Sequence, residues 1–274
     1  MEFGLFFLPA LIGIGLLWLF SGDDIPTVEV SEGEDFNGTD AAEHIIGTDV
    51  GDMISAGGGF DIVDGNGGDD IIFGNAGNDT LNGGDGNDAI EGGFGDDLID
   101  LGDGDDVSGS AYDEEDVFVG NYRQTGDDRI YGGDGDDVIV DQNGSNVIDG
   151  GNGNDEIAAL DAQDTDAADI IDAGAGADFV LADDGDTVTL GTGADQIAGL
   201  VTDRDDVITV TDFDPAEDAI ELIWQGTGHD ETLVELFEVA GGLMLHFDGQ
   251  DIMFLEGLGA ADIPFITYTR VGFY

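Results

Sequence analysis

The sequence contains neither lysine nor cysteine, and its only basic side chains besides three histidines are four arginines. Without cysteine it has no disulfide, zinc thiolate or thiol nucleophile, and without lysine it has no Schiff-base chemistry and no phosphate-loop lysine. Arg123, Arg129, Arg204 and Arg270 do not make the basic surface that a phosphate backbone requires. Nucleic-acid binding is therefore excluded.

Acidic residues and glycine are abundant instead. The 274 residues include 64 Asp and Glu and 48 Gly, and the formal net charge is −60. Such self-repulsion opposes folding, so we expect a cation to complete the structure. Carboxylate and carbonyl oxygens are the ligands that Ca²⁺ prefers, and no soft ligand competes with them. A solvated acidic surface or a disordered acidic tail is the alternative, but either would scatter Asp and Glu instead of interleaving Asp with Gly.

An uncharged apolar run occupies residues 3–20, and its 18 residues are enough for a membrane-spanning helix. We expect residues 1–22 to form an uncleaved transmembrane anchor and residues 23–37 to form an acidic linker. A cleaved signal peptide and a buried helix are the alternatives. The signal peptide is disfavoured because the start of the chain has no positive charge and no A-x-A-like site follows Phe20.

A nine-residue period begins at Gly38 and is clearest in seven consecutive units from residue 47 to residue 109. Position 6 is Asp in all seven units, position 4 is Gly in six, and position 8 is aliphatic in six. Val50 at position 4 and Ser108 at position 8 are the exceptions. The period is interrupted at 110–122 and 159–172, which we interpret as loops that leave a continuous solenoid.

Each unit divides into a turn and a strand. Six Gly-rich residues can turn with positive φ and expose carbonyl oxygens, and three residues such as Ile71, Ile72 and Phe73 make a short strand whose position 8 faces inward. Two units then close one coil, and the coils stack as parallel strands around a narrow apolar column. Successive Asp residues alternate sides, which predicts one row with Asp61, Asp79 and Asp97 and another with Asp52, Asp70, Asp88 and Asp106.

The unit resembles the G-G-x-G-x-D-x-U-x nonapeptide of the repeats-in-toxin (RTX) calcium-binding proteins. The resemblance implies an all-β fold, a right-handed parallel β-roll over residues 38–206, with several Ca²⁺ ions between adjacent turns. It implies that Asp carboxylates and the carbonyls of Gly-rich positions hold these ions. The candidate calcium ligands are Asp52, Asp61, Asp70, Asp79, Asp88, Asp97, Asp106, Asp128, Asp137, Asp155, Asp178, Asp195, Gly84, Gly86, Gly93, Gly95, Gly133 and Gly135.

Some units depart from the pattern, and a solenoid without metal is the alternative for the whole array. Asn146 replaces Asp at position 6, and Asp186 lies in a degenerate unit, so we expect weaker sites there. Ionised Asp residues cannot stack in a row without a cation between them, which disfavours the metal-free alternative.

The composition changes near Val207, where alternating and continuous apolar segments predict strands. We expect residues 207–274 to form a β cap that covers the last coil, since an open solenoid end exposes unpaired strands. Residues 211–222 resemble the segment that closes the calcium roll in many bacterial RTX proteins. Phe247, Phe254 and Phe265 are predicted to pack in the core of the cap.

The sequence favours a protein that is not an enzyme. His44, His229 and His246 are far apart, and neither an H-E-x-x-H nor a G-x-S-x-G motif occurs. The leading hypothesis is a membrane-anchored, calcium-binding structural or interaction subunit, associated with other membrane proteins. Its roll would lie on the periplasmic side of a bacterial inner membrane, because cytosolic calcium is too low for such modules. The alternatives are a secreted, extracellular RTX adhesin or surface protein exported by the type I route, and an enzyme.

Overall fold

The computed structural model describes residues 25–31, 35–109, 125–141, 143–160, 167–183, 185–201, 207–225, 234–247, 250–259, 261–262 and 265–271. The predicted membrane anchor, residues 1–22, lies outside these ranges. The regular elements of the described ranges are β-strands. Within these ranges there is no helix long and apolar enough to cross a bilayer.

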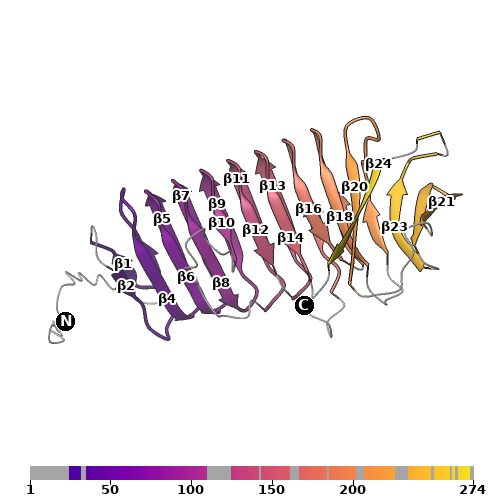
Figure 1. Ribbon diagram of the computed structural model, residues 1–274. Helices are drawn as coiled ribbons and strands as arrows, with labels where there is room; N and C mark the ends of the chain where they lie inside the picture. The colour runs from indigo at the N-terminus through magenta and orange to yellow at the C-terminus, as the bar shows by residue number, and fades with distance from the viewer. Residues whose placement is uncertain are drawn as a thin grey trace, which may run out of the picture.

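The strands form two sheets that face each other along an elongated stack, and they alternate between the sheets in chain order (Figure 1). Sheet A contains, in spatial order, β1 (Thr27–Glu29), β3 (His44–Ile46), β5 (Ile62–Gly67), β7 (Thr80–Asp85), β9 (Leu98–Asp103), β11 (Arg129–Asp134), β13 (Val147–Asn152), β15 (Ile170–Asp172), β17 (Thr187–Thr189), β19 (Ile208–Val210), β23 (Gln250–Glu256), β22 (Gly242–Phe247) and β21 (Val234–Val239). Sheet B contains β2 (Asp35–Asn37), β4 (Met53–Gly59), β6 (Ile71–Gly77), β8 (Ala89–Phe94), β10 (Val107–Ser108), β12 (Val138–Asp141), β14 (Glu156–Ala159), β16 (Phe179–Ala182), β18 (Gln196–Val201), β20 (Ala219–Gln225) and β24 (Phe265–Val271).

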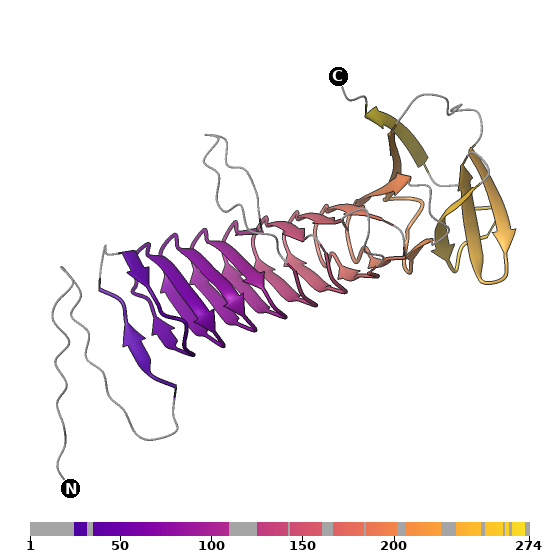
Figure 2. The same ribbon diagram turned by 90° about the horizontal axis from the view of Figure 1, so that it is seen from below.

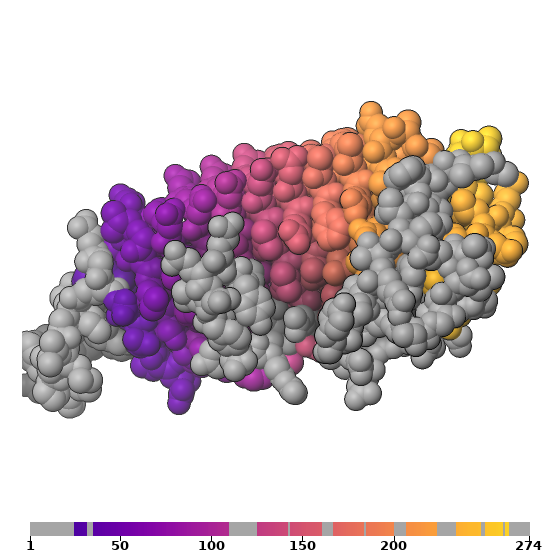
Figure 3. Space-filling view, in the orientation of Figure 1, coloured from indigo at the N-terminus to yellow at the C-terminus, as the bar shows by residue number. Residues whose placement is uncertain are grey.

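Each coil contributes one strand to each sheet, and its strands pair in parallel with those of the coils before and after. The register matches equivalent positions of the repeat: Ile54 pairs with Ile72, and Ile72 with Ile90. The interruption at 110–122 leaves this register intact, because Ile99 pairs with Ile130 on its far side. The predicted parallel solenoid is confirmed, and the colour runs in chain order from one end of the elongated molecule to the other (Figure 3).

The core is a column of position-8 side chains between the sheets. Ile, Val and Leu at this position are almost fully buried in coil after coil, as at Ile72 and Leu81, which are 0% exposed. Ser108 occupies the same column, is also 0% exposed, and has no hydrogen-bond partner for its hydroxyl within the described residues. Each coil therefore contacts mainly its two neighbours, so the stack needs several coils to be stable.

The solenoid begins earlier than the period indicates. Residues 23–37, predicted as a linker, contain β1 and β2, the first strand of each sheet. Val28 and Phe36 are the inward residues of these strands, with exposed fractions of 2% and 6%. Each of these strands has a single buried side chain, and the residues around it are mostly acidic or polar. The repeat pattern is therefore hard to detect in this part of the sequence.

The parallel pairing also continues past residue 206. Strand β19 extends sheet A, and β20 and β24 extend sheet B in parallel, within the segment predicted as a cap. Sheet A then ends in an antiparallel meander of β23, β22 and β21, seen at the yellow end of the molecule (Figure 2). Of the residues predicted for the core of the cap, Phe247 is buried, with 0% exposure, whereas Phe254 is only half-buried.

Candidate metal centre

Two rows of buried residues, all acidic except Asn146, run along the stack, one at the start of each sheet's strands. Successive members lie on successive coils, and the backbone N–H of one donates to a side-chain oxygen of the next at 2.7–3.1 Å. Row 1 precedes the strands of sheet A and contains Glu43, Asp61, Asp79, Asp97, Asp128, Asn146, Asp169 and Asp186. Row 2 precedes the strands of sheet B and contains Asp52, Asp70, Asp88, Asp106, Asp137, Asp155, Asp178, Asp195 and Asp218. The predicted alternation of successive Asp residues between two rows is confirmed.

Glycine makes the turns that place these carboxylates. Positions 2 and 4 of the regular units have positive φ, for example 112° at Gly84 and 140° at Gly86. Asn66 and Asn75 adopt φ of 75° at position 2, a conformation that Asn tolerates better than most residues. At position 4 a side chain would also collide with the coil before, because a Cβ on Gly86 would meet the carbonyl oxygen of Gly68. The Gly-x-Gly pattern is therefore required both by the backbone conformation and by the close spacing of the coils.

The interior carboxylates use one oxygen and leave the other without a partner. Oδ1 accepts the N–H of the preceding row member, whereas Oδ2 is buried and has no hydrogen-bond partner within the described residues. Nine residues share this arrangement: Asp61, Asp70, Asp79, Asp88, Asp97, Asp106, Asp137, Asp155 and Asp178. A buried carboxylate oxygen without a donor costs free energy, so each of these atoms calls for a cation or a proton.

At five of these turns, those of Asp70, Asp79, Asp88, Asp137 and Asp155, the unpartnered Oδ2 lies beside the glycine at position 1, near a backbone carbonyl oxygen of the next coil. A Cβ placed on Gly74 would be 2.8 Å from Oδ2 of Asp79 and 2.5 Å from the carbonyl oxygen of Gly92 on the next coil. A Cβ on Gly65 would likewise be 2.5 Å from Oδ2 of Asp70, and it would meet the carbonyl oxygen of Gly83. At these turns a carboxylate oxygen and a carbonyl oxygen from two coils thus lie close to the same glycine, next to core side chains such as Leu81.

Burial raises the pKa values of twelve row carboxylates above the ordinary range: Asp61, Asp70, Asp79, Asp88, Asp97, Asp106, Asp128, Asp137, Asp155, Asp178, Asp195 and Asp218. It raises the pKa of Asp70, Asp97 and Asp137 to about 7, although an N–H donor from the preceding coil lowers each and neighbouring carboxylates raise it further. The pKa of Asp61 and Asp106 rises to about 6 for the same reasons. At neutral pH the rows therefore favour either protonation or a cation that compensates their charge.

These donors fit calcium. No group of three or more His, Asp or Glu side chains converges in the described parts of the chain, so a cation here would draw on backbone carbonyls as well as carboxylates. Ca²⁺ accepts such mixed oxygen shells in flexible geometry, and the donors available here are all hard oxygens. Asn146 is less suited, because its Nδ2 donates to the carbonyl oxygen of Gly144 at 3.3 Å.

The structure places all twelve predicted Asp ligands in the two rows, and the six predicted Gly ligands at positions 2 and 4 of the adjoining turns, all with positive φ. Four row members are not predicted from the sequence: Glu43, Asp169, Asp218, and Asp186, for which only a weaker site is expected. Each is an acid that lies two residues before a buried aliphatic residue, as Asp169 does before Ile171. That spacing was the available signal, but irregular turns around these residues concealed the period.

Other polar features lie outside the rows. Glu91 is 2% exposed on β8, neither of its carboxylate oxygens has a partner within the described chain, and burial raises its pKa to about 7. His44 pairs with Asp64 at 3.0 Å, and His246 pairs with Asp251 at 2.9 Å. These histidines thus contact carboxylates on neighbouring strands.

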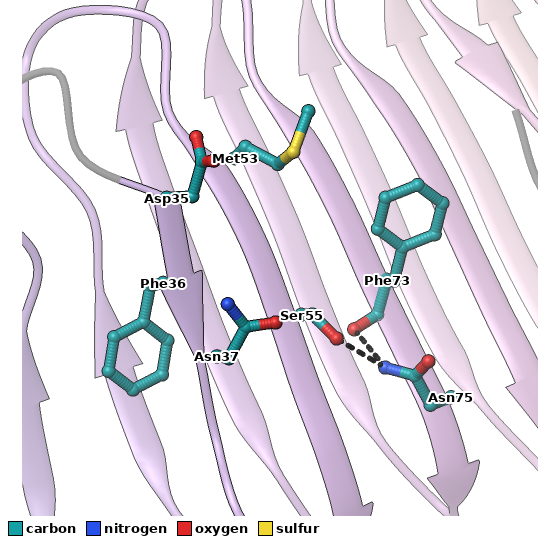
Figure 4. A pocket seen from close by; sticks show the side chains of 7 residues that line it. All are labelled: Asp35, Phe36, Asn37, Met53, Ser55, Phe73 and Asn75. Atoms are coloured by element: carbon teal, nitrogen blue, oxygen red, sulfur yellow. Dashed lines mark hydrogen bonds between the residues drawn. The ribbon is translucent and has the colours of Figure 1, made fainter. Parts of the chain in front are cut away.

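A pocket of about 360 Å³ lies on sheet B near its first strands (Figure 4). Asn75 closes one side of it and donates from Nδ2 to Oγ of Ser55 and to the carbonyl oxygen of Phe73, each at 3.1 Å. The complete lining is Asp35, Phe36, Asn37, Met53, Ser55, Phe73 and Asn75. Asp35 is the one titratable group in this set.

The fold and the two rows define a parallel β-roll whose turns present oxygen ligands for a hard cation. A family model, the RTX calcium-binding nonapeptide repeat, matches four times, at residues 46–81, 73–107, 123–157 and 162–188. The chain therefore carries RTX calcium-binding repeats, as its sequence indicates. Two of the matches overlap, and together they cover most of the interior coils.

No curated protein sequence matches the chain. Among solved structures, the extracellular lipase LipA from Serratia marcescens is similar, with 18% sequence identity and a TM-score of 0.24. The match covers 87% of this chain and 41% of the lipase, so this chain spans less than half the length of that protein.

Proposed function

We propose that this protein is a membrane-anchored structural or interaction subunit whose β-roll folds around several calcium ions. The observation that carries the calcium part is the set of nine buried Oδ2 atoms that lack partners in the turns of RTX repeats. The uncharged run of residues 3–20 supports the membrane part, because no charge interrupts it.

An interaction role is supported by the outer face of sheet B. Met53, Val138 and Phe179 alternate with buried residues on β4, β12 and β16, so they point away from the core. Met53 is 43% exposed. The exposed Glu156 lies between Val138 and Phe179 in register, so this face offers another protein a surface of apolar side chains interrupted by a carboxylate.

The calcium requirement supports a location outside the cytosol. Extracellular calcium modules bind with dissociation constants of about 10⁻⁴–10⁻³ M, far above cytosolic calcium. We therefore place the roll on the periplasmic side of a bacterial inner membrane.

The test is membrane fractionation of cells that express the full chain, with carbonate and chelator washes and sequencing of the amino terminus. We expect the protein to remain in the membrane pellet and to begin at Met1. A matched variant with Leu11→Asp and Leu16→Asp should move to the soluble fraction, since two charges in the apolar run oppose insertion. Release of the unchanged protein by chelator alone, or a mature terminus near Ser21, would contradict the anchor and favour a secreted adhesin.

A further inference from the structure

The first turn of each acidic row differs from the interior turns. In row 1, Glu43 accepts a hydrogen bond from the backbone N–H of Thr39 at 2.8 Å and another from its hydroxyl at 3.0 Å. In row 2, Oδ2 of Asp52 accepts the N–H of Thr48 at 2.7 Å and its hydroxyl at 3.0 Å. Oδ2, which is unpartnered in the interior coils, is therefore satisfied at Asp52, whereas Oδ1 of Asp52 is buried without a partner within the described residues.

These satisfied oxygens occupy the same place as the unpartnered ones. A Cβ on Gly47 would be 3.0 Å from Oδ2 of Asp52, and a Cβ on Gly65 would be 2.5 Å from Oδ2 of Asp70 on the next coil. In row 1, a Cβ on Gly38 would be 2.6 Å from Oε2 of Glu43. Each first carboxylate thus points into the gap before the second coil. There Oδ2 of Asp52 accepts both Thr48 donors, and Oε2 of Glu43 accepts the Thr39 N–H while its Oε1 accepts the Thr39 hydroxyl.

The conformation of position 2 explains the difference. Interior units have Gly or Asn at this position with positive φ, such as 75° at Asn66 and 112° at Gly84. Thr39 and Thr48 do not have positive φ, in keeping with the poor tolerance of β-branched residues for that region. Their N–H groups consequently point at the carboxylate four residues later. In row 2 the Thr48 hydroxyl also bonds the backbone of Val50, which holds it in place.

We infer that Thr39 and Thr48 close the first gap of each row, so that calcium is confined to the gaps that follow and the amino-terminal coil is held by protein hydrogen bonds. A hydroxyl and an N–H both donate, so they compete with a cation for the same carboxylate oxygen. The inference rests on the proposed calcium binding of the interior turns. It assigns Thr48 a specific role: it excludes metal from a turn that otherwise has the ligands of the repeat.

Native mass spectrometry of the full chain in calcium, with detergent for the apolar run, counts the bound ions directly. The variant Thr48→Gly with Val50→Gly restores the repeat pattern at positions 2 and 4, and we expect it to bind one ion more than the unchanged protein. Thr48→Ser keeps both donors and should leave the count unchanged. An unchanged count in the double glycine variant would overturn the inference.

A second pair of variants tests the same claim without opening a new site. Asp52→Asn should leave the ion count unchanged, because the inference gives Asp52 no ion, whereas Asp88→Asn should lower it. A lower count for Asp52→Asn would overturn the inference. If the unchanged protein bound no calcium at all, the proposed function itself would fail, and this outcome is distinct from a failure of the threonine closure.

Discussion

At the scale of single residues, the row carboxylates differ in what their second oxygen contacts. Asp88 is 2% exposed, accepts the N–H of Asp70 on Oδ1 and leaves Oδ2 without a partner within the described chain. Asp186 is 0% exposed, but it accepts the N–H of Asp169 on Oδ1 and that of Asp183 on Oδ2. The weaker calcium site expected at Asp186 thus has a physical reason besides its irregular unit: local N–H groups supply hydrogen bonds where a cation would otherwise bind.

Asp88→Asn tests the unpartnered oxygen most simply. The amide oxygen can still accept the N–H of Asp70, but an NH₂ group replaces the anionic Oδ2, so we expect the calcium concentration at the folding midpoint to rise several-fold. Asp100→Asn is the matched control, because Asp100 is exposed on β9 outside the turns. Calcium titrations followed by circular dichroism should separate the two, and equal midpoints would contradict the assignment.

Glu91 predicts a stability change that depends on pH. Burial raises its pKa from 4.5 to about 7, so folding favours the protonated form. The free-energy cost of burying the ionised Glu91 carboxylate is absent below its unfolded pKa and grows as pH rises. Above about pH 7 this cost is complete and reaches up to about 3 kcal/mol. Glu91→Gln should therefore raise the thermal midpoint at pH 8 in calcium and change it little at pH 4.5. A variant that is equally or less stable at pH 8 would show that Glu91 has a compensating partner.

At the scale of the repeat unit, the turn depends on glycine at particular positions. Gly86 has φ of 140°, and a Cβ there would meet the carbonyl oxygen of Gly68, so Gly86→Ala combines backbone strain with a collision. We expect Gly86→Ala to lower the free energy of unfolding, measured in calcium, by about 1–3 kcal/mol. Gly67→Ala is the control, because φ is not positive there and the nearest atom to its Cβ, a carbonyl oxygen of Asp85, lies at 3.5 Å. Denaturant unfolding of both variants in calcium checks this, and similar losses would argue against the positional requirement.

The sequence predicts the interior units well for a simple physical reason. Asp at position 6 and an aliphatic residue at position 8 recur at a fixed spacing, and the turn permits few residues at positions 2 and 4. The ends are harder to predict, because β1 and β2 each have a single inward residue and the Asp218 turn contains no glycine pattern. The Thr48 closure could not be predicted, since its effect depends on φ and on which oxygen the N–H reaches.

At the scale of the whole molecule, charge couples folding to cations and to pH. In calcium-free buffer, row carboxylates such as Asp70 and Asp97, with pKa values of about 7, bind protons more tightly when folded than when unfolded. The calcium-free fold should therefore gain stability as pH falls from 8 towards 4.5. Calcium binding must displace those protons. The calcium concentration at the folding midpoint should therefore rise as pH falls from 8 towards 4.5. Circular dichroism at several pH values tests both trends, and a midpoint independent of pH would contradict the account.

The central claim is that calcium completes the fold of this chain, and one titration tests it directly. The far-ultraviolet circular dichroism of the full chain at pH 8 should show largely unfolded backbone in chelator and a cooperative gain of β-structure at millimolar Ca²⁺. Magnesium at the same concentration should be much less effective, because it requires stricter octahedral geometry. A full β-sheet spectrum in chelator at pH 8, unchanged by calcium, would contradict the claim.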